Sequence, residues 1–408
     1  MMIGAARATL RKGQPVLRNL TYPRTTAVRY LSSLHHLNSS QPEACSQRPE
    51  DVASVSTYTT SEIRPTRVAV FSSQRFERDF INNNTAILTK LPGLTLEYFV
   101  PRLTPGTAHM ANGADAVCAF VNDVLDRKAL TTLAANGTNC VLMRCAGHNN
   151  VDLEAAEELN ISVMNVPKYS PHAVAEFAVS LLMTVVRKTH KAYNRVRESN
   201  FSLSGLMGSD FHGKTVGVIG TGKIGRIFCR IMGQGFGCRV VAYDRRESDE
   251  AKALGVEYVS KEELLRESDI VALHCPLTPE THHMIDAEAI EQMKPGVVLI
   301  NTSRGGLVNM HDLIDGLRSK RIGACGFDVV EGEDSLFFED HSGEILEDET
   351  VAELLTFPNV LMTPHLAFCT ETAMANIWTT TVGNMKEYLD VRDGVSDDES
   401  GLTHGVAV

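Results

Sequence analysis

The pattern that most constrains the fold is Gly220-Thr-Gly222-Lys-Ile-Gly225, which directly follows an apolar run at 215–219. At a strand-to-helix turn, Gly220 allows the tight turn, Gly222 lets a pyrophosphate approach the backbone, and Gly225 lets the helix pack closely on the strand. The first N–H groups of that helix would face the phosphates. Asp244 ends the next apolar run, where a carboxylate can hold the adenosine ribose hydroxyls. The pattern therefore predicts a dinucleotide-binding unit.

Short apolar runs and helical patterns alternate over most of the chain, which favours parallel sheets with helices on both faces. A first series of predicted strands lies at 67–71, 96–99, 116–120, 140–143 and 162–165. A long helical pattern follows from Ser170-Pro171 to about Arg195, with Ser as N-cap. A second series of predicted strands lies at 215–219, 239–243, 270–274, 297–301, 323–327 and 360–362. Six strands wound with helices would complete a dinucleotide-binding sheet, so the predicted fold class is α/β with two Rossmann-like domains.

Composition excludes a disordered, collagenous, disulfide-stapled or membrane-spanning chain. The 408 residues are 43% hydrophobic and 22% charged, which is ordinary for a globular chain of two or three domains. No apolar run reaches the ~20 residues that a membrane-spanning helix needs. The nine cysteines are odd in number and scattered, without a C-x-x-C pair, so we expect reduced thiols and no metal.

The two ends of the chain differ in charge from its body. Residues 1–42 carry six Arg and Lys and no Asp or Glu, so removing them from the net charge of −11 leaves −17 for the rest. Such an acidic body would repel nucleic acid and anionic membranes, and neither is an expected partner. The Arg- and Ser-rich segment 1–42 is typical of a mitochondrial transit peptide, which would direct the protein to the mitochondrial matrix. The alternative is a tail without a targeting function on a cytoplasmic protein. We expect 43–65 to be a linker and 393–408 a flexible tail.

Four polar residues follow the later predicted strands: Arg304, Asp328, Glu333 and His365. The carboxyl ends of strands in an open α/β sheet face the ligand crevice, so these side chains can converge. A guanidinium can grip the carboxylate of a 2-keto acid and polarise its carbonyl, a histidine can donate the proton, and a carboxylate can fix that histidine. Each residue also has a plain structural alternative, such as a helix cap for Arg304 or a loop position for His365.

These residues resemble the D-isomer-specific 2-hydroxyacid dehydrogenases, and within that family the fermentative D-lactate dehydrogenases. The resemblance covers nearly everything from Arg67 to about Leu389. Its most specific stretches are Arg144-Cys-Ala-Gly147-His-Asn-Asn-Val-Asp152, Val166-Pro-Lys-Tyr169-Ser-Pro171, the run 213–225, Asn301-Thr-Ser-Arg304-Gly305 and Pro364-His-Leu-Ala-Phe368.

The resemblance implies a role for each matching residue. Arg304 would bind substrate, Glu333 would support the histidine, and His365 would be the acid/base. Backbone N–H groups near Ala146 and Gly147 would receive the substrate carboxylate, with Tyr169 close by. Besides Gly220, Gly222, Gly225 and Asp244, the NAD groove would be lined by Lys223, Ile224, Cys275, Pro276, Thr281, Thr302, Ser303 and Asp328, with Asp328 on the nicotinamide amide.

The family also implies a split architecture and a homodimer. Residues 66–168 and 367–392 would form a discontinuous substrate domain, and 169–366 an inserted NAD-binding domain. Closure of the cleft between them would exclude water from hydride transfer.

The expected reaction is reversible hydride transfer between NADH and pyruvate. Other 2-keto acids, such as hydroxypyruvate, glyoxylate or branched-chain acids, are the alternative, and a corepressor-like NAD-sensing protein is a third. His148 and Gln74-Arg75-Phe76 depart from the family pattern near the substrate, which leaves substrate size open, although His148 is more simply a structural histidine. Asp244 favours NAD over NADP, whereas Arg245 and Arg246 beside it weaken that preference.

Overall fold

The computed structural model describes residues 65–333, 336–395 and 405–406. The predicted transit peptide and all but the last residue of the predicted linker lie outside these ranges. Within the described ranges, no helix combines the length and the apolar composition that crossing a bilayer requires.

Five parallel strands form the first sheet, in the order β2-β1-β3-β4-β5. They are β1 (Thr66–Val70), β2 (Leu94–Tyr98), β3 (Ala116–Ala119), β4 (Cys140–Met143) and β5 (Ser162–Met164). The connecting helices are α1 (Arg75–Asn83), η1 (Thr85–Lys90), η2 (Ala108–Ala111), α2 (Arg127–Ala135) and α3 (Leu153–Glu158). Strands β3 and β4 are buried along their whole length, as expected of a parallel sheet covered on both faces.

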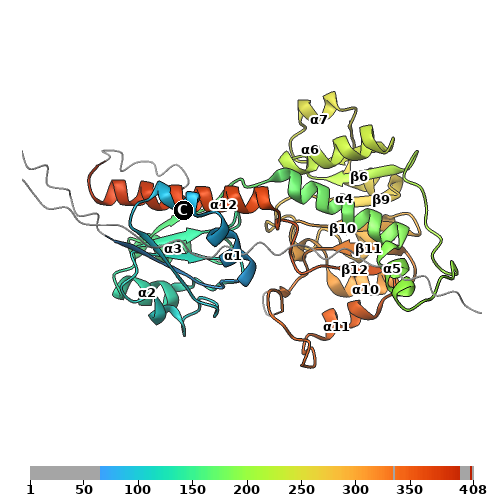
Figure 1. Cartoon of the computed structure of the whole chain (residues 1–408). Coiled ribbons are helices and arrows are strands. Elements are labelled where there is room, and N and C mark those ends of the chain that lie inside the picture. The colour runs from blue at the N-terminus through green and yellow to red at the C-terminus, as the bar shows by residue number, and fades with distance from the viewer. Residues whose placement is uncertain (1–64, 334–335, 396–404, 407–408) are drawn as a thin grey trace, which may run out of the picture. The chain divides into compact units, whose positions relative to one another are not determined.

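The last long helix, α12 (Glu371–Arg392), packs on this first sheet although it is far away in sequence (Figure 1). Its buried residues Trp378 and Met385 share one apolar cluster with Val70 and Leu142 of β1 and β4. The domain built on the first sheet, which is the predicted substrate domain, is therefore discontinuous, as the family resemblance implied, while its exact boundaries stay predictions.

Seven parallel strands form the second sheet, in the order β12-β11-β10-β9-β6-β7-β8. They are β6 (Thr215–Ile219), β7 (Arg239–Tyr243), β8 (Glu257–Tyr258), β9 (Ile270–Leu273), β10 (Val297–Asn301), β11 (Ile322–Phe327) and β12 (Val360–Met362). Its helices are α4 (Pro171–Arg187), α5 (Thr189–Arg197), α6 (Lys223–Arg230), η3 (Ile231–Gly235), α7 (Asp249–Ala253), α8 (Lys261–Glu267), α9 (Ala287–Gln292), η4 (Gly305–Leu307), α10 (Met310–Arg318) and α11 (Glu349–Thr356). The predicted fold class is confirmed.

Three local features differ from the predictions. The helix expected from 171 to about 195 is interrupted at Lys188, whose φ of 53° is left-handed and ends α4. The edge strand β8 was not predicted, because two residues are too few for an alternation pattern. The predicted flexible tail is held at one point, since Gly405 pairs antiparallel with Met164 and the Val406 N–H donates to the carbonyl of Val163.

A buried ion pair fixes the loops at the carboxyl ends of the strands in the first sheet. Arg144, 1% exposed, follows β4, and its Nε and Nη2 donate to the two carboxylate oxygens of Glu77 at 2.9 and 3.3 Å. The same guanidinium donates to the carbonyls of Ser72 and Cys118 and lies over the ring of Phe120. Removing one partner of such a pair leaves an uncompensated buried charge. Arg144 thereby holds the loops after β1, β3 and β4 in one arrangement.

We expect Arg144→Met to lower the free energy of unfolding of this domain by about 3–5 kcal/mol, because Glu77 would stay buried without its counter-charge. Urea unfolding followed by fluorescence measures this selectively, since the one tryptophan of the chain, Trp378, lies in the core of the same domain. The matched control Arg67→Met removes an exposed pair with Glu97 and should cost less than about 1 kcal/mol. Equal losses in the two variants would refute the role of Arg144.

Candidate active site

The carboxyl ends of neighbouring parallel strands bring the predicted residues together. In the second sheet β10, β11 and β12 are adjacent, so the segments after Asn301, Phe327 and Met362 meet at one edge. A cavity of about 250 Å³ lies there. Nine of the predicted residues line it: Tyr169, Ile224, Cys275, Pro276, Thr302, Ser303, Arg304, Asp328 and His365.

His365 and Glu333 form a hydrogen-bonded pair. His365 Nδ1 lies 2.6 Å from Glu333 Oε1, and both side chains are less than one-fifth exposed. The second carboxylate oxygen of Glu333 accepts from the Val330 N–H at 2.8 Å, which fixes the carboxylate. His365 has a left-handed backbone, with φ of 53°, a conformation that costs energy for a residue other than glycine. The pair directs the imidazole so that Nε2 is left for the ligand.

Asp328 anchors the loop that carries His365. The residue is fully buried, and its carboxylate accepts hydrogen bonds from Thr363 Oγ1 at 2.6 Å and from the backbone N–H groups of Leu366 and Ala367 at 2.9 and 2.8 Å. Burial raises the pKa of Asp328, and these hydrogen bonds oppose the rise. The structure thus shows a positioning role for Asp328, and its predicted contact with the nicotinamide amide stays a prediction.

Arg304 is a half-buried cation that forms no ion pair with any described residue. Its Nη1 donates to the carbonyl of Ser303 at 2.7 Å, and its backbone carbonyl accepts from the side chain of Asn301 at 2.8 Å. A Cβ on Gly147 would lie only 2.7 Å from Arg304 Nη2, so the absence of a side chain there lets the guanidinium approach the loop. The geometry leaves the remaining donors of Arg304 free for an anion.

Around the predicted carboxylate site, the N–H groups of Ala146 and Gly147 donate no hydrogen bond within the described part of the chain. The carbonyl of Ala146 accepts from Asn165, which holds the loop. Gly147 and Glu333 line a second cavity of about 320 Å³, which also contains Arg304 and His365. Asn149 lines both cavities and was not singled out in the sequence, because an asparagine in a turn carries no distinctive pattern.

The glycine loop fits a dinucleotide. Gly220 has φ of 96°, and a Cβ there would lie 2.6 Å from the backbone of His274. A Cβ on Gly225 would lie 2.0 Å from the carbonyl of Gly220, whereas Gly222 faces open space at the start of α6. Two glycines therefore allow the close turn, and the third leaves the room that a pyrophosphate needs at the helix N-terminus.

Asp244 lies at the end of β7 beside this loop. Its Oδ2 accepts from the N–H of Thr221 at 2.6 Å and from the Thr221 hydroxyl at 3.0 Å, and Tyr258 donates to that hydroxyl. Burial would raise the pKa of Asp244, but the hydrogen bonds from Thr221 and Arg246 outweigh it and lower the pKa. The ionised carboxylate would repel a 2′-phosphate, which favours NAD. Arg245 and Arg246 are exposed.

Besides the three glycines and Asp244, two further predicted cofactor residues, Lys223 and Thr281, do not line the main cavity. Lys223 is the exposed first residue of α6. The hydroxyl of Thr281 donates to the carbonyl of Pro276 at 2.8 Å and accepts from the N–H of Thr278, so it stabilises its own loop. His148 is half-buried and lines neither cavity, which supports its structural interpretation. Gln74 donates to the carbonyl of Phe338 at 3.0 Å and so contacts the loop beside His365.

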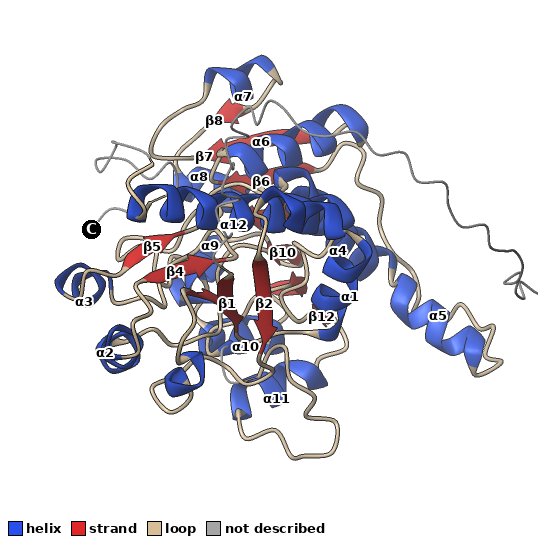
Figure 2. Ribbon diagram, turned by 60° about the vertical axis from the view of Figure 1, so that its left-hand side comes forward, coloured by secondary structure: helices blue, strands red, loops and turns tan. Residues whose placement is uncertain are grey.

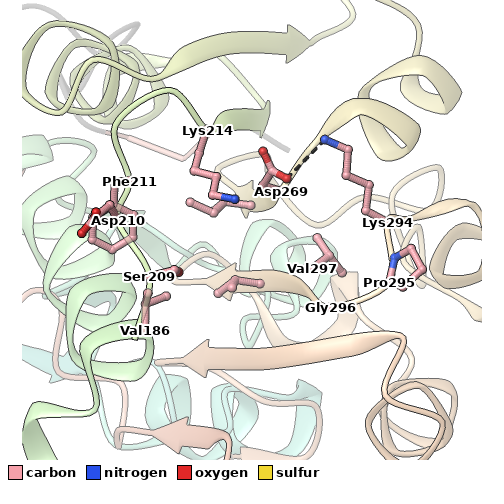
Figure 3. A pocket seen from close by; sticks show the side chains of 12 residues that line it. Val186, Ser209, Asp210, Phe211, Lys214, Asp269, Lys294, Pro295, Gly296 and Val297 are labelled. Carbon is pink, nitrogen blue, oxygen red and sulfur yellow. Dashed lines mark hydrogen bonds and ion pairs between the residues drawn. The ribbon is translucent and has the colours of Figure 1, made fainter. Parts of the chain in front are cut away.

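A separate cavity of about 190 Å³ lies at the opposite edge of the second sheet, where β6, β9 and β10 begin (Figure 3). There Lys294 pairs with Asp269 at 3.2 Å, and Asp269 accepts from the Thr215 N–H at 2.9 Å. Ligands of open α/β sheets bind at the carboxyl ends of the strands. We therefore place the active site at the edge that holds Arg304 and His365.

Comparisons with known proteins agree with this geometry. Residues 179–367 match the family model described as "D-isomer specific 2-hydroxyacid dehydrogenase, NAD binding domain". The chain is 49% identical over 325 residues to "2-hydroxyacid dehydrogenase A" of Aspergillus oryzae, covering 79% of this chain and 92% of that protein. The chain belongs to the D-isomer-specific 2-hydroxyacid dehydrogenase family. It is also 46% identical over 319 residues to the D-lactate dehydrogenase of Escherichia coli, covering 78% and 95%.

A solved structure, from work on the pyruvate reductase of Chlamydomonas reinhardtii, superposes with a TM-score of 0.75 at 44% identity. It covers 80% of this chain and 97% of that one. The membership makes this dehydrogenase an NAD-dependent enzyme, and the loop around Gly220 and the ionised Asp244 fit that cofactor.

His274, which lines the main cavity, predicts a pH effect on stability. Both of its ring nitrogens are buried and have no partner among the described residues, although part of the residue is accessible. Burial lowers the pKa of His274 to about 4. The unfolded chain therefore takes up a proton at His274 near pH 6.5, whereas the folded protein takes it up only near pH 4. The contribution of the neutral imidazole to the free energy of unfolding is thus present above pH 6.5 and is lost as the pH falls toward 4.

Without cofactor, we expect the wild type to lose about 2 kcal/mol more than His274→Gln between pH 7 and pH 5. Urea titrations at the two pH values measure this difference. The exposed control His311→Gln should behave as the wild type does. Equal losses in wild type and His274→Gln would show that the imidazole is solvated.

Proposed function

We propose that this enzyme is a D-lactate dehydrogenase, which reversibly reduces pyruvate to D-lactate with NADH. The observation that carries the proposal is that Arg304, whose guanidinium has no ion-pair partner among the described residues, lines one cavity with the His365–Glu333 pair. The similarity to the Escherichia coli and Chlamydomonas enzymes supports it. Those relatives are named for lactate and pyruvate respectively.

Arg304 is the binding group for the substrate carboxylate. A keto acid brings the negative charge that this half-buried cation lacks, and a charge-assisted hydrogen bond to a guanidinium is about twice as strong as a neutral one. The N–H groups of Ala146 and Gly147, which donate to no described residue, supply further donors on the facing loop. Donors of Arg304 not used by the carboxylate can polarise the keto carbonyl, because a guanidinium has five N–H groups in a fixed plane.

His365 holds the proton for the keto oxygen. Its Nδ1 is engaged with Glu333, so the proton exchanged with substrate is carried on Nε2. The hydrogen bond to Glu333 fixes the orientation of the imidazole. NADH, when bound, supplies the hydride to the keto carbon. In the reverse direction the neutral imidazole accepts the hydroxyl proton of lactate.

Aromatic side chains beside His365 favour a substrate with an apolar side group. The rings of Phe120 and Phe338 lie 5.1 Å apart, those of Phe120 and Phe368 5.6 Å, and those of Phe338 and His365 6.0 Å. Phe368 also lines the main cavity. An aromatic wall suits the apolar methyl group of pyruvate better than the hydroxymethyl group of hydroxypyruvate or the hydrogen of glyoxylate. We therefore rank pyruvate above these two acids, and we rank it above branched-chain keto acids because of the similarity to enzymes named for lactate and pyruvate.

The proposal is tested by NADH oxidation with a panel of keto acids, ranked by kcat/KM. Pyruvate should rank first. His365→Gln should lower kcat by about 10²- to 10⁴-fold, because general acid catalysis is lost. Arg304→Leu should raise KM for pyruvate by about 30-fold or more. Binding of NADH, measured by fluorescence, should persist in both variants.

A higher kcat/KM for a bulky keto acid than for pyruvate would contradict the proposed substrate. Turnover that survives in His365→Gln would contradict the proposed acid.

We also propose that the enzyme is a homodimer joined through α5 and the loop after it. No residue of α5 is buried, and the segment exposes five large apolar side chains: Tyr193, Val196, Phe201, Leu203 and Met207. In Figure 2, α5 projects from the second sheet. An exposed apolar group of this size is typical of a protein interface, and a second copy of the chain is the occupant that we propose.

Light scattering after size exclusion should give twice the 44.7 kDa chain mass for the wild type. Charges at the interface oppose association, so Phe201→Asp combined with Leu203→Asp should give the monomer. A wild type that is monomeric at micromolar concentration would refute the homodimer.

For localisation we propose the mitochondrial matrix, on the ground that residues 1–42 are basic and free of acidic residues. Fusion of these residues to a fluorescent protein should direct it to mitochondria. Replacing Arg7, Arg11 and Arg18 with Glu should abolish the import. A diffuse distribution of the unaltered fusion would favour the cytoplasm instead.

A further inference from the structure

Three potential metal ligands lie together beside the active site: His282, His283 and Glu331. Nε2 of His283 lies 2.9 Å from both carboxylate oxygens of Glu331, and Nε2 of His282 lies 3.5 Å from Oε1. One ligand atom from each residue lies within 4.8 Å of the other two. The catalytic chemistry described above uses none of these side chains. The sequence offered no metal motif, because Glu331 is 48 residues from His283.

The arrangement matches the coordination preferences of zinc. Zinc binds imidazole nitrogen and carboxylate oxygen at about 2.0–2.2 Å, so neighbouring ligand atoms of a tetrahedral site lie about 3.3 Å apart. The separations of 2.9 and 3.5 Å fall on either side of this value. The two imidazole rings are stacked, with centroids 3.8 Å apart, which brings both Nε2 atoms to the same carboxylate.

The three ligands are held by different parts of the second sheet. His283 and Glu331 lie on the loops after β9 and β11, respectively, and the N–H of His283 donates to the carbonyl of Gly306 at 2.8 Å. His282 and Glu331 line the same cavity as Arg304 and His365. Three protein ligands leave one position of a tetrahedral metal open, as in zinc sites that exchange a ligand.

We propose that His282, His283 and Glu331 form a site for a divalent transition metal, with zinc as its occupant. Copper would bind a set of this type more tightly, so zinc occupies it because of availability and not of greater affinity. Protons compete with the metal for the imidazoles, and binding weakens as the pH falls.

A regulatory consequence rests on the proposed function. The metal would link the loops after β9 and β11, and Glu331 is only two residues from Glu333. The metal's open coordination position would also compete with Arg304 for the substrate carboxylate in the cavity lined by His282, Glu331 and Arg304. Bound zinc should therefore slow pyruvate reduction, and a chelator should restore the rate.

The site is tested by titrating the full-length chain with zinc in a calorimeter, without pyruvate. His282→Asn and Glu331→Gln should each lose about one equivalent of zinc per chain relative to the wild type. The matched control His172→Asn should lose none, because His172 faces Glu176 at 3.9 Å without a third ligand among the described residues. All other histidines and cysteines are unchanged in these variants, so zinc bound elsewhere on the chain cancels in the comparison. The difference in zinc stoichiometry between the variants therefore reports this site.

A His282→Asn variant that binds as much zinc as the wild type would overturn the site. Since binding is measured without substrate, this failure is distinct from a failure of the proposed function. In the NADH assay, zinc should inhibit the wild type and His172→Asn but spare His282→Asn. If zinc binds but the turnover of the wild type is unchanged, the result would support the metal site and contradict its regulatory role.

Discussion

The proposed active site depends on the guanidinium of Arg304. This side chain is half-buried and has no ion-pair partner in the described chain, so an anion that reaches it gains charge-assisted hydrogen bonds. The surroundings preserve this state: Asn301 holds the backbone of Arg304, and Gly147 keeps side-chain atoms away from its guanidinium. In the proposed mechanism, the substrate carboxylate supplies the negative partner of Arg304. This accounts for the preference for an anionic substrate, and the proposed proton transfer from His365 accounts for the keto group.

The parallel topology places His365, the proposed proton donor, beside this cation. Arg304 and His365 are 61 residues apart, yet they follow β10 and β12, which lie on either side of β11. Asp328, at the end of β11, joins the arrangement by accepting hydrogen bonds from the loop that carries His365. The glycine loop follows β6 at the same edge of the sheet, so the proposed cofactor and substrate sites lie on neighbouring segments. Buried hydrogen bonds, rather than contacts within one motif, set the geometry.

Sequence patterns predicted the strands and their carboxyl ends well, because apolar runs bounded by glycine and polar residues are local signals. They therefore predicted which side chains could meet around the cavity. They failed where the cause is not local. The stretch Arg187-Lys188-Thr189 gives no sequence signal for the left-handed residue that ends α4. The residues around Asp328 likewise do not indicate that its carboxylate accepts hydrogen bonds from backbone N–H groups 38 and 39 residues away. The His282, His283 and Glu331 cluster is likewise produced only by tertiary folding.

The central claim is that Arg304 and His365 face one small keto acid from two sides. A crystal structure with NADH and oxamate, an unreactive isostere of pyruvate, tests it most directly. The account predicts the oxamate carboxylate within hydrogen-bonding distance of Arg304 and of the N–H groups of Ala146 or Gly147, with its carbonyl oxygen on His365 Nε2. Oxamate bound away from Arg304, or a guanidinium paired with a protein carboxylate in the closed enzyme, would contradict it.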